Sequence, residues 1–273
     1  MFKAACIQLN NKDDLDENLA AAEGFVRAAV REGASLILTP ENSCRMCHPV
    51  TKKLANAELE EESLALKFYK SLAKELGVEI IIGSLSIKLE KRKLANRSYV
   101  IGADGEIISS YDKIHLFDVD LPNGERYRES AVIQPGDKAV VAQASAAQIG
   151  LSICYDVRFS HLYRDMAKSG AQILSIPAAF SMPTGEAHWE TLLRARAIET
   201  GSFVLAAGQE GVHDGGRECW GHSRIIGPWG DIRAGIDTGQ GYIIAEIDLE
   251  DVTAARASIP ALEHDRDYQL QDQ

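Results

Sequence analysis

Segments with the apolar period of a helix alternate with short apolar segments in the first half of the chain. Apolar residues recur at helical spacing over two stretches, and a glycine closes each pattern. Asp104-Gly105 separates two further β-prone runs and is a strong hairpin signal. The expected elements are helices at 14–31 and 59–76 and strands at 4–9, 35–39, 78–87, 97–101 and 107–111. Two strand–helix units followed by a hairpin predict an α/β fold with a mixed sheet and helices packed on it.

The stretch from Asp112 to Gly136 has neither a helical nor a strand period. A loop of this length inside a compact domain is usually functional or disordered. Its apolar residues Phe117, Leu121 and Tyr127 favour an ordered loop at a functional site.

The second half of the chain continues the alternation of strands and helices. Thr184 is expected to cap a helix whose apolar stripe includes Trp189 and Leu193. The other expected elements are two strand segments in 139–153, strands at 172–176, 202–207, 223–226 and 242–247, and helices at 161–168 and after Asp248. A polar, charged tail begins at about residue 262. No internal repeat or linker interrupts the chain, so one domain over 1–273 is predicted.

Charge and composition exclude several classes of partner. The net charge of −11 argues against nucleic acid or an anionic membrane as a main partner. No apolar run approaches the ~18 residues that a membrane-spanning helix needs, and the first residues lack the features of a signal peptide. The five cysteines are odd in number and scattered. A reduced, cytoplasmic protein is therefore predicted.

Cys154 ends an apolar, β-prone run that starts at Ile149 and is followed by the polar residues Asp156 and Arg158. In open α/β sheets, ligands bind at the carboxyl ends of strands, so this thiol is a candidate for chemistry. The alternative is a packed structural cysteine, because free cysteines are among the most buried residues.

Glu41 and Lys113 also follow predicted strands, so three strand ends each offer one ionisable group. Either residue alone could be a solvated surface residue, but together with Cys154 they form a coherent set. A cysteine is nucleophilic as the thiolate and needs a base or a nearby cation. Glu41 would remove the thiol proton and later activate water, with a pKa raised by partial burial. Lys113 would lower the thiol pKa and, with the backbone N–H of Tyr155, stabilise an oxyanion.

Three blocks of sequence resemble the catalytic blocks of the nitrilase superfamily of carbon–nitrogen hydrolases. They are T-P-E-N-S around Glu41, Y-D-K-I-H-L-F-D-V-D around Lys113 and L-S-I-C-Y-D-V-R-F around Cys154. Two further blocks resemble the Nit1/Nit2-like amidase branch: P-T-G-E-A-H-W-E-T-L-L-R-A-R-A-I-E-T and W-G-H-S-R-I-I-G-P-W-G. The resemblance extends from the first strand to Asp248.

The resemblance implies an α-β-β-α sandwich that pairs into a homodimer or a larger homo-oligomer with a four-layer core. It also implies hydrolysis of a small linear amide that carries a carboxylate, of the ω-amide or deaminated-glutathione type. The products would be an acid and ammonia, formed through a Cys thioester. In this family's pattern Glu41 is the general base, Lys113 stabilises the oxyanion, and Cys154 is the nucleophile. Glu129 matches a fourth acidic residue that positions substrate and lysine.

Arg158 matches an arginine found in amidases that act on carboxylate-bearing substrates. The planar guanidinium suits a carboxylate, although an ion pair of Arg158 with Asp156 or Asp165 is an alternative. Tyr155 and Phe180 are predicted to wall the pocket, or else to serve as core aromatic residues.

Several alternatives remain open. A nitrilase or an N-carbamoyl amide hydrolase would use the same trio, and a non-catalytic scaffold would keep only the fold. His188 could act as a papain-like base for Cys154, which would leave Lys113 without a purpose. The block Ser43 to His48 is expected to face the substrate, and it contains the haem c pattern C-x-x-C-H, which would require export. A zinc site there would need a further ligand at suitable spacing. We therefore expect no cofactor and no metal.

Overall fold

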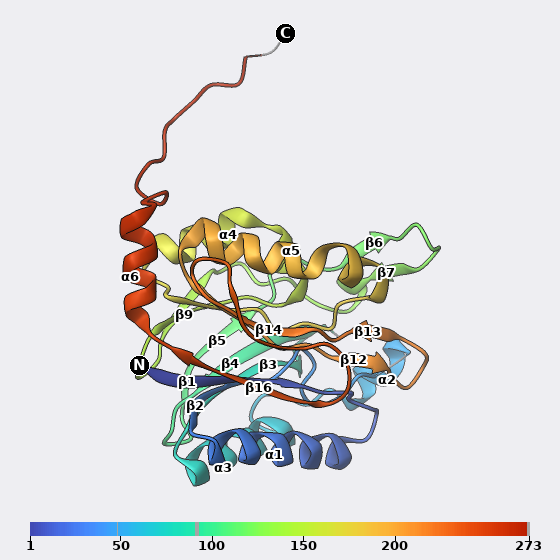
Figure 1. The fold of residues 1–273 in the computed structure, drawn as a ribbon. Coiled ribbons are helices and arrows are strands. Elements are labelled where there is room, and N and C mark those ends of the chain that lie inside the picture. The colour runs from blue at the N-terminus through green and yellow to red at the C-terminus, as the bar shows by residue number, and fades with distance from the viewer. Residues whose placement is uncertain (48, 91–92, 272–273) are drawn as a thin grey trace.

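Four layers make up the fold in a computed structural model, which describes residues 1–47, 49–90 and 93–271. Figure 1 shows two sheets stacked between two layers of helices. The helices of one outer layer are α1 (Leu15–Arg31) and α3 (Leu64–Leu76), and those of the other are α4 (Ser160–Lys168) and α5 (Met182–Thr200). The predicted α-β-β-α sandwich is confirmed, and a single chain supplies all four layers. Pairing of two chains stays a prediction.

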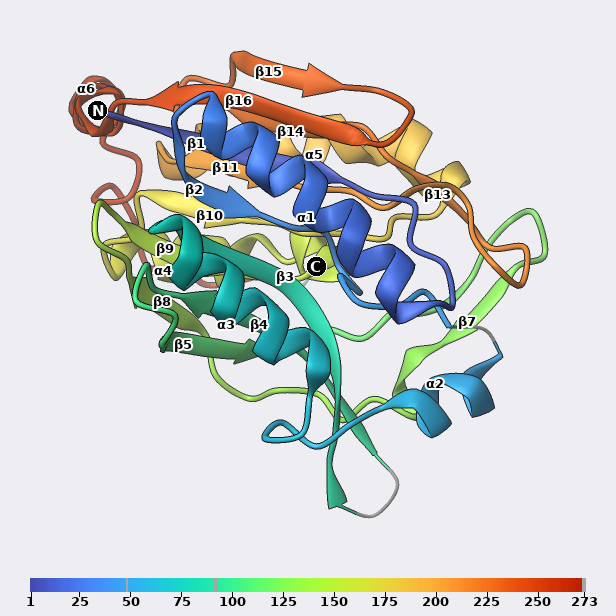
Figure 2. The same ribbon diagram turned by 90° about the horizontal axis from the view of Figure 1, so that it is seen from below.

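The first sheet has six strands in the order β16-β1-β2-β3-β4-β5. Strands β1, β2 and β3 are parallel, as expected for two strand–helix units, and β16 returns antiparallel beside β1. Figure 2 shows α1 and α3 lying across this sheet. Its strands are β1 (Phe2–Gln8), β2 (Ala34–Leu38), β3 (Glu79–Lys88), β4 (Leu94–Ile101), β5 (Ile107–Asp112) and β16 (Gly241–Ile247).

The second sheet also has six strands, in the order β15-β14-β11-β10-β9-β8, and its central strands β9, β10 and β11 are parallel. Its strands are β8 (Val140–Gln143), β9 (Gln148–Leu151), β10 (Ile173–Ser175), β11 (Phe203–Ala206), β14 (Ser223–Ile226) and β15 (Ile232–Ile236).

Smaller elements gather at one end of the sandwich (Figures 1 and 2). They are the hairpin β6 (Asp118–Asp120) and β7 (Arg126–Arg128), the hairpin β12 (Glu210–Val212) and β13 (Glu218–Trp220), and the helix α2 (Val50–Asn56). The last helix, α6 (Leu249–Ser258), lies at the opposite end; Asp265 still pairs with Arg164 and Lys168 of α4, and the exposed residues 266–271 extend away from the body.

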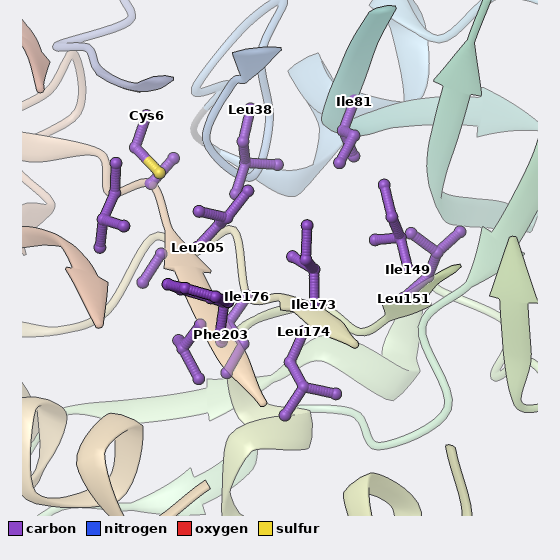
Figure 3. Packing of buried hydrophobic residues seen from close by; sticks show 14 of the residues in the cluster. Cys6, Leu38, Ile81, Ile149, Leu151, Ile173, Leu174, Ile176, Phe203 and Leu205 are labelled. Atoms are coloured by element: carbon purple, nitrogen blue, oxygen red, sulfur yellow. The ribbon is translucent and has the colours of Figure 1, made fainter. Parts of the chain in front are cut away.

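The core between the sheets is formed by side chains that meet from both sides. Cys6, Leu38 and Ile81 of the first sheet point toward Ile149 and Ile173 of the second (Figure 3). All five side chains are fully buried. Full burial of a leucine or isoleucine side chain stabilises the fold by about 1.5–3 kcal/mol. Strands covered on both faces read as continuous apolar runs, which explains their clear signal in the sequence.

Most of the predicted elements are confirmed to within a few residues, but two helix starts were wrong. Leu59 precedes a turn over residues 60–62, and α3 begins only at Leu64, where the Ser63 side chain accepts the amide N–H of Leu66 at 3.3 Å. Helix α5 begins at Met182 and is preceded by Ser181, so Thr184 lies within its first turn instead of capping it. Proline in that first turn is compatible with the helix because its missing N–H would be unpaired there in any case.

The loop from Asp112 to Gly136 is ordered, as predicted, but it contains the β6–β7 hairpin and a 3₁₀ turn over Glu129–Ala131. Strands of three residues are too short to show a period in the sequence. Within the described ranges, no helix has the length and apolar character required to cross a bilayer.

Candidate active site

The ends of three strands converge on one cavity of about 510 Å³. Glu41 follows β2, Lys113 follows β5 directly, and Cys154 follows β9 of the other sheet. The loop that carries β6 and β7 adds Glu129 to the same wall. All four predicted ionisable residues therefore lie together, although Glu129 and Glu41 are 16 and 72 positions away from Lys113 in the sequence.

Lys113 is the centre of a buried ion cluster. Its Nζ lies 3.0 Å from Glu41 Oε1 and 2.9 Å from Glu129 Oε2, and only 2% of its side chain is exposed. Asn96 Nδ2 donates to Oε1 of both carboxylates, at 2.8 Å for Glu41 and 3.2 Å for Glu129. The other oxygen of Glu41, Oε2, accepts the backbone N–H of Ala179 at 2.9 Å. Glu41 is thus held in one orientation by donors from three segments.

Asn96 was missed by the sequence analysis. It is buried in β4, where asparagine is an uncommon strand residue, and that mismatch is the signal that could have found it.

Cys154 opens a 3₁₀ turn, Cys154–Arg158, in a backbone conformation rare for a residue with a side chain. Its φ is 50°, in the left-handed region, and its N–H donates to the Pro177 carbonyl at 2.8 Å. Residues held in this region store of order 1–3 kcal/mol of strain and cluster at functional sites. The turn therefore holds the sulfur at the cavity instead of continuing the strand.

Asp156 anchors this turn to the first sheet. Its Oδ2 accepts the Ile153 N–H at 2.8 Å and the Tyr111 hydroxyl at 2.7 Å, and its Oδ1 accepts the His115 N–H at 3.0 Å. The carboxylate is fully buried, so its hydrogen bonds fix the nucleophile relative to β5 and Lys113. Among the described residues it makes no ion pair with Arg158.

The electrostatics of the cluster place the resting proton on sulfur. Burial alone would raise the pKa of Glu41, but the charge of Lys113, with help from Arg217 and Asn96, lowers that pKa to about 2. Burial raises the pKa of the Cys154 thiol, and Glu41 adds to this, while Lys113 and the Ala179 amide oppose it less strongly. Burial would lower the pKa of Lys113, but Glu129 and Glu41 raise it well above its usual value.

The raised pKa predicted for Glu41 is therefore wrong in direction, while the predicted lowering effect of Lys113 on the Cys154 pKa exists but is outweighed. The pKa of Glu41 is lowered, because nearby donors and cations outweigh burial. The pKa of Cys154 is raised, because burial and the Glu41 charge outweigh the effect of Lys113.

Aromatic side chains form part of the cavity wall. Tyr155 and Phe180 both line it, as do Phe117 and Tyr127 of the β6–β7 loop. Phe117 and Tyr155 pack edge to face with ring centroids 5.2 Å apart. These rings give the cavity an apolar side facing the ion cluster.

Arg158 is not among the lining residues. Its guanidinium lies 5.7 Å from the ring centre of Tyr155 and 5.3 Å from that of Phe180, so it contacts two side chains that do line the cavity. Its Nη1 is 3.2 Å from Nδ1 of His188, which is likewise not a lining residue. This placement favours Glu41 over His188 as the partner of Cys154.

Two cationic residues that the sequence analysis missed, Lys53 and Arg217, line the cavity. Cys47 also lines it, which agrees with the expectation for the Ser43–His48 block, and Cys44 and Cys47 are both free thiols. His48, the last residue of the C-x-x-C-H pattern, lies outside the described residues. In the part of the chain that is described, no three His, Cys, Asp or Glu residues are grouped so as to hold a metal ion.

Comparisons with known proteins match nearly the whole chain. A model of the carbon-nitrogen hydrolase family matches residues 3–257. The deaminated glutathione amidase of Synechocystis sp. is 39% identical over 267 residues, which cover 96% of this chain and 97% of that protein. The omega-amidase NIT2 of Bos taurus is 34% identical over 265 residues, covering 97% of this chain and 95% of that one.

Solved structures share the fold as well. The NitFhit protein of C. elegans matches with a TM-score of 0.91 and 34% identity over 97% of this chain, which spans 65% of that longer chain. An amidase of Nesterenkonia sp. AN1, solved after Michael addition of acrylamide at its active-site cysteine, matches with a TM-score of 0.79 and 25% identity. That match covers 95% of this chain and 98% of that one.

The matches in sequence and structure agree with the cavity and its ion cluster. This chain belongs to the carbon–nitrogen hydrolase family of the nitrilase superfamily and is an enzyme that hydrolyses carbon–nitrogen bonds of amides other than peptide bonds.

Proposed function

We propose that this enzyme hydrolyses a small linear amide that carries a carboxylate, of the ω-amide or deaminated-glutathione type, through a thioester on Cys154. The observation that carries the proposal is the placement of Glu41, Lys113, Glu129 and Cys154 on one cavity wall, with Lys113 within 3.0 Å of Glu41. The names of the similar proteins, deaminated glutathione amidase and omega-amidase, support the substrate class. No cofactor takes part in the proposed reaction.

In the first half-reaction the sulfur attacks the amide carbonyl carbon. Glu41 accepts the thiol proton as the C–S bond forms, and the carbonyl π electrons move to oxygen. Lys113 and the Tyr155 N–H would stabilise the resulting oxyanion. When the oxyanion collapses, the C–N bond breaks and the proton passes from Glu41 to the leaving nitrogen, which departs as ammonia.

In the second half-reaction Glu41 removes a proton from water, whose oxygen attacks the thioester carbon. The C–S bond then breaks, the acid is released, and the proton returns to sulfur. Because Glu41 is ionised and the thiol is protonated at rest, the first proton transfer is unfavourable before substrate binds. It becomes favourable only as the negative charge moves from sulfur to the carbonyl oxygen beside Lys113.

Glu129 takes part in this proposal as a positioning residue. Its two oxygens lie 3.2 and 2.9 Å from Lys113 Nζ, and Oε2 also accepts the Phe117 N–H at 2.7 Å. It therefore orients the lysine and ties the β6–β7 loop to the site. The contact of Arg158 with the substrate carboxylate, the pairing of chains and the cytoplasmic location stay predictions.

The decisive assay measures ammonia release from deaminated glutathione, α-ketoglutaramate, simple nitriles and N-carbamoyl amino acids. Wild type should act on one or both amides, and mass spectrometry of rapidly quenched enzyme should find an acyl group on Cys154. Cys154→Ala and Cys154→Ser should lose both turnover and acyl adduct. Full activity of Cys154→Ala would end the covalent mechanism, and turnover of nitriles or N-carbamoyl compounds without amides would reject the substrate class.

A further inference from the structure

Two cationic side chains on the cavity wall have no part in the proposed reaction. Lys53 comes from α2, and Arg217 from the turn between β12 and β13, which lie at the same end of the sandwich (Figures 1 and 2). Five basic and four acidic side chains line the cavity, and two of the basic ones, Arg126 and Arg128, are paired with Asp120. Lys113 is paired as well, so Lys53 and Arg217 are the lining cations whose charge is available to a ligand.

In the described part of the chain neither cation forms an ion pair with a carboxylate, although the charge of Glu41 acts on both from a longer distance. Within residues 1–47, 49–90 and 93–271, no carboxylate lies within 4.0 Å of Lys53 or Arg217, whereas Lys113 has two. The nearest polar partner of Lys53 Nζ is Asn42 Oδ1, at the long distance of 3.4 Å. Arg217 Nη2 donates to the Ala179 carbonyl at 2.7 Å, but its buried Nε has no acceptor among the described residues.

Both side chains are half-buried, and even partial burial without a counter-ion is unfavourable for a cation. An ionised side chain away from water is stable only when it is paired or hydrogen-bonded. Burial lowers the pKa of Lys53, and Arg217 and Lys113 contribute to this, while Glu129 and Glu41 oppose it. A bound carboxylate would supply the missing charge for both residues.

The surroundings of Arg217 orient it for such a partner. Its guanidinium lies 5.4 Å from the ring centre of Tyr127 and its Nη2 donates to the Ala179 carbonyl, so two contacts hold the group at the cavity wall. A fixed guanidinium presents two parallel N–H groups to a carboxylate, and Lys53 can add a third donor. Arg158 differs, because it packs on Tyr155 and Phe180 and does not line the cavity.

We propose that Lys53 and Arg217 form the site that binds the substrate carboxylate and thereby select anionic amides over neutral ones. This inference rests on the proposed function, since it assumes amide hydrolysis at Cys154. It assigns the choice of substrate to α2 and the β12–β13 hairpin instead of to Arg158.

The test compares succinamate with butyramide, which has the same chain length and a methyl group where succinamate has its carboxylate. The ratio of kcat/KM for the two amides is measured for wild type, Lys53→Met and Arg217→Gln. Loss of one charged hydrogen bond predicts that each variant lowers the preference for succinamate by about 10- to 100-fold. Lys52→Met is the matched control, because Lys52 pairs with Asp13 at the surface and does not line the cavity. It should leave the ratio unchanged.

An equal loss on both amides, or a change of preference in Arg158→Gln alone, would overturn the assignment. A binding measurement separates this outcome from failure of the proposed function. In the Cys154→Ala background, calorimetry should show succinamate binding that weakens about 10-fold or more with Lys53→Met. Absence of succinamate binding, or binding insensitive to both substitutions, would refute the anion site. Ammonia release that survives Cys154→Ala would instead refute the covalent mechanism.

Discussion

Replacement of Lys113 by methionine should destabilise the protein through repulsion between the two carboxylates that the lysine now separates. Oε1 of Glu41 and Oε1 of Glu129 both lie within hydrogen-bonding distance of the same Asn96 Nδ2, so the carboxylates face each other. Their side chains are 5% and 15% exposed, which leaves little screening by water. Loss of one partner from a buried ion pair costs about 3–5 kcal/mol, and we expect Lys113→Met to lie in that range.

Removing one of the two negative charges should recover part of this loss. Glu129→Gln alone should cost about 1–3 kcal/mol, because a charged hydrogen bond to Lys113 is lost. In the double variant Lys113→Met/Glu129→Gln the repulsion is absent. The combined loss should therefore be smaller than the sum of the single losses by about 1–3 kcal/mol, the size of coupling between contacting residues. Activity should stay lost in the double variant, because the oxyanion donor is missing.

The free energies of unfolding would be measured by urea denaturation followed by circular dichroism. The exposed pair of Lys70 and Glu106, 3.1 Å apart, provides the matched control cycle with Lys70→Met and Glu106→Gln. Its coupling should not exceed about 1 kcal/mol, because exposed pairs are screened by water. If the Lys113 cycle proved additive to within about 0.5 kcal/mol, the buried cluster would not hold the carboxylates as described.

Four further predictions follow from single contacts. Cys154→Gly should be more stable than Cys154→Ala by about 1 kcal/mol, because φ at this position is 50°; equal urea midpoints would contradict the strained turn. Gly83→Ala should cost about 1–3 kcal/mol and reduce turnover, because a Cβ would collide with the Thr39 and Pro40 carbonyls just before Glu41; a stable, active variant would refute this. The pKa of Glu41 is lowered from 4.5 to about 2, so its stabilising effect exists above pH 4.5 and is lost as the pH falls toward 2. Glu41→Gln should flatten the loss of stability in that pH window, and a slope equal to that of wild type would be inconsistent with an ionised Glu41. Arg158→Lys tests the contact predicted from the sequence against the site assigned to Lys53 and Arg217: because Arg158 does not line the cavity, the KM ratio of carboxylate-bearing to neutral amides should stay unchanged, and a rise in KM confined to carboxylate-bearing amides would contradict this.

The helices and strands of the sandwich could be predicted because the long elements bury one consistent face, whereas the α-β-β-α arrangement was implied by the resemblance to the nitrilase superfamily. Helix α1 was recovered to within one residue, since Leu19, Ala22 and Val26 carry the helical period. Asp14, where the predicted helix began, caps it by accepting the Glu17 N–H at 3.0 Å. The elements that were missed have no such signal. Helix α2 has no buried residue, so its sequence shows no apolar helical period. The two small hairpins have strands of three residues, which are too short to show the alternation of a strand.

The positions of the ionisable residues could be predicted only because each follows a strand. The position after a strand indicated Glu41, Lys113 and Cys154, but it gives no information about cavity residues that belong to short helices and hairpins. Lys53 comes from a helix without a buried face and Arg217 from a hairpin turn, so only tertiary structure brings them to the cavity. Asn96 is fixed by its two carboxylate partners, which lie 55 and 33 residues away.

The direction of the pKa shifts could not be predicted because it depends on a balance between burial and donors. Sequence indicates that Glu41 follows a strand and is partly buried, which by itself raises a carboxylate pKa. It does not show that Lys113, Asn96 and the Ala179 amide all donate to the same carboxylate. These donors keep Glu41 ionised, and burial, with the Glu41 charge adding to it, raises the pKa of the Cys154 thiol. The site is thus arranged to form the nucleophile only when a carbonyl oxygen beside Lys113 can take up the charge, which couples proton transfer to substrate binding.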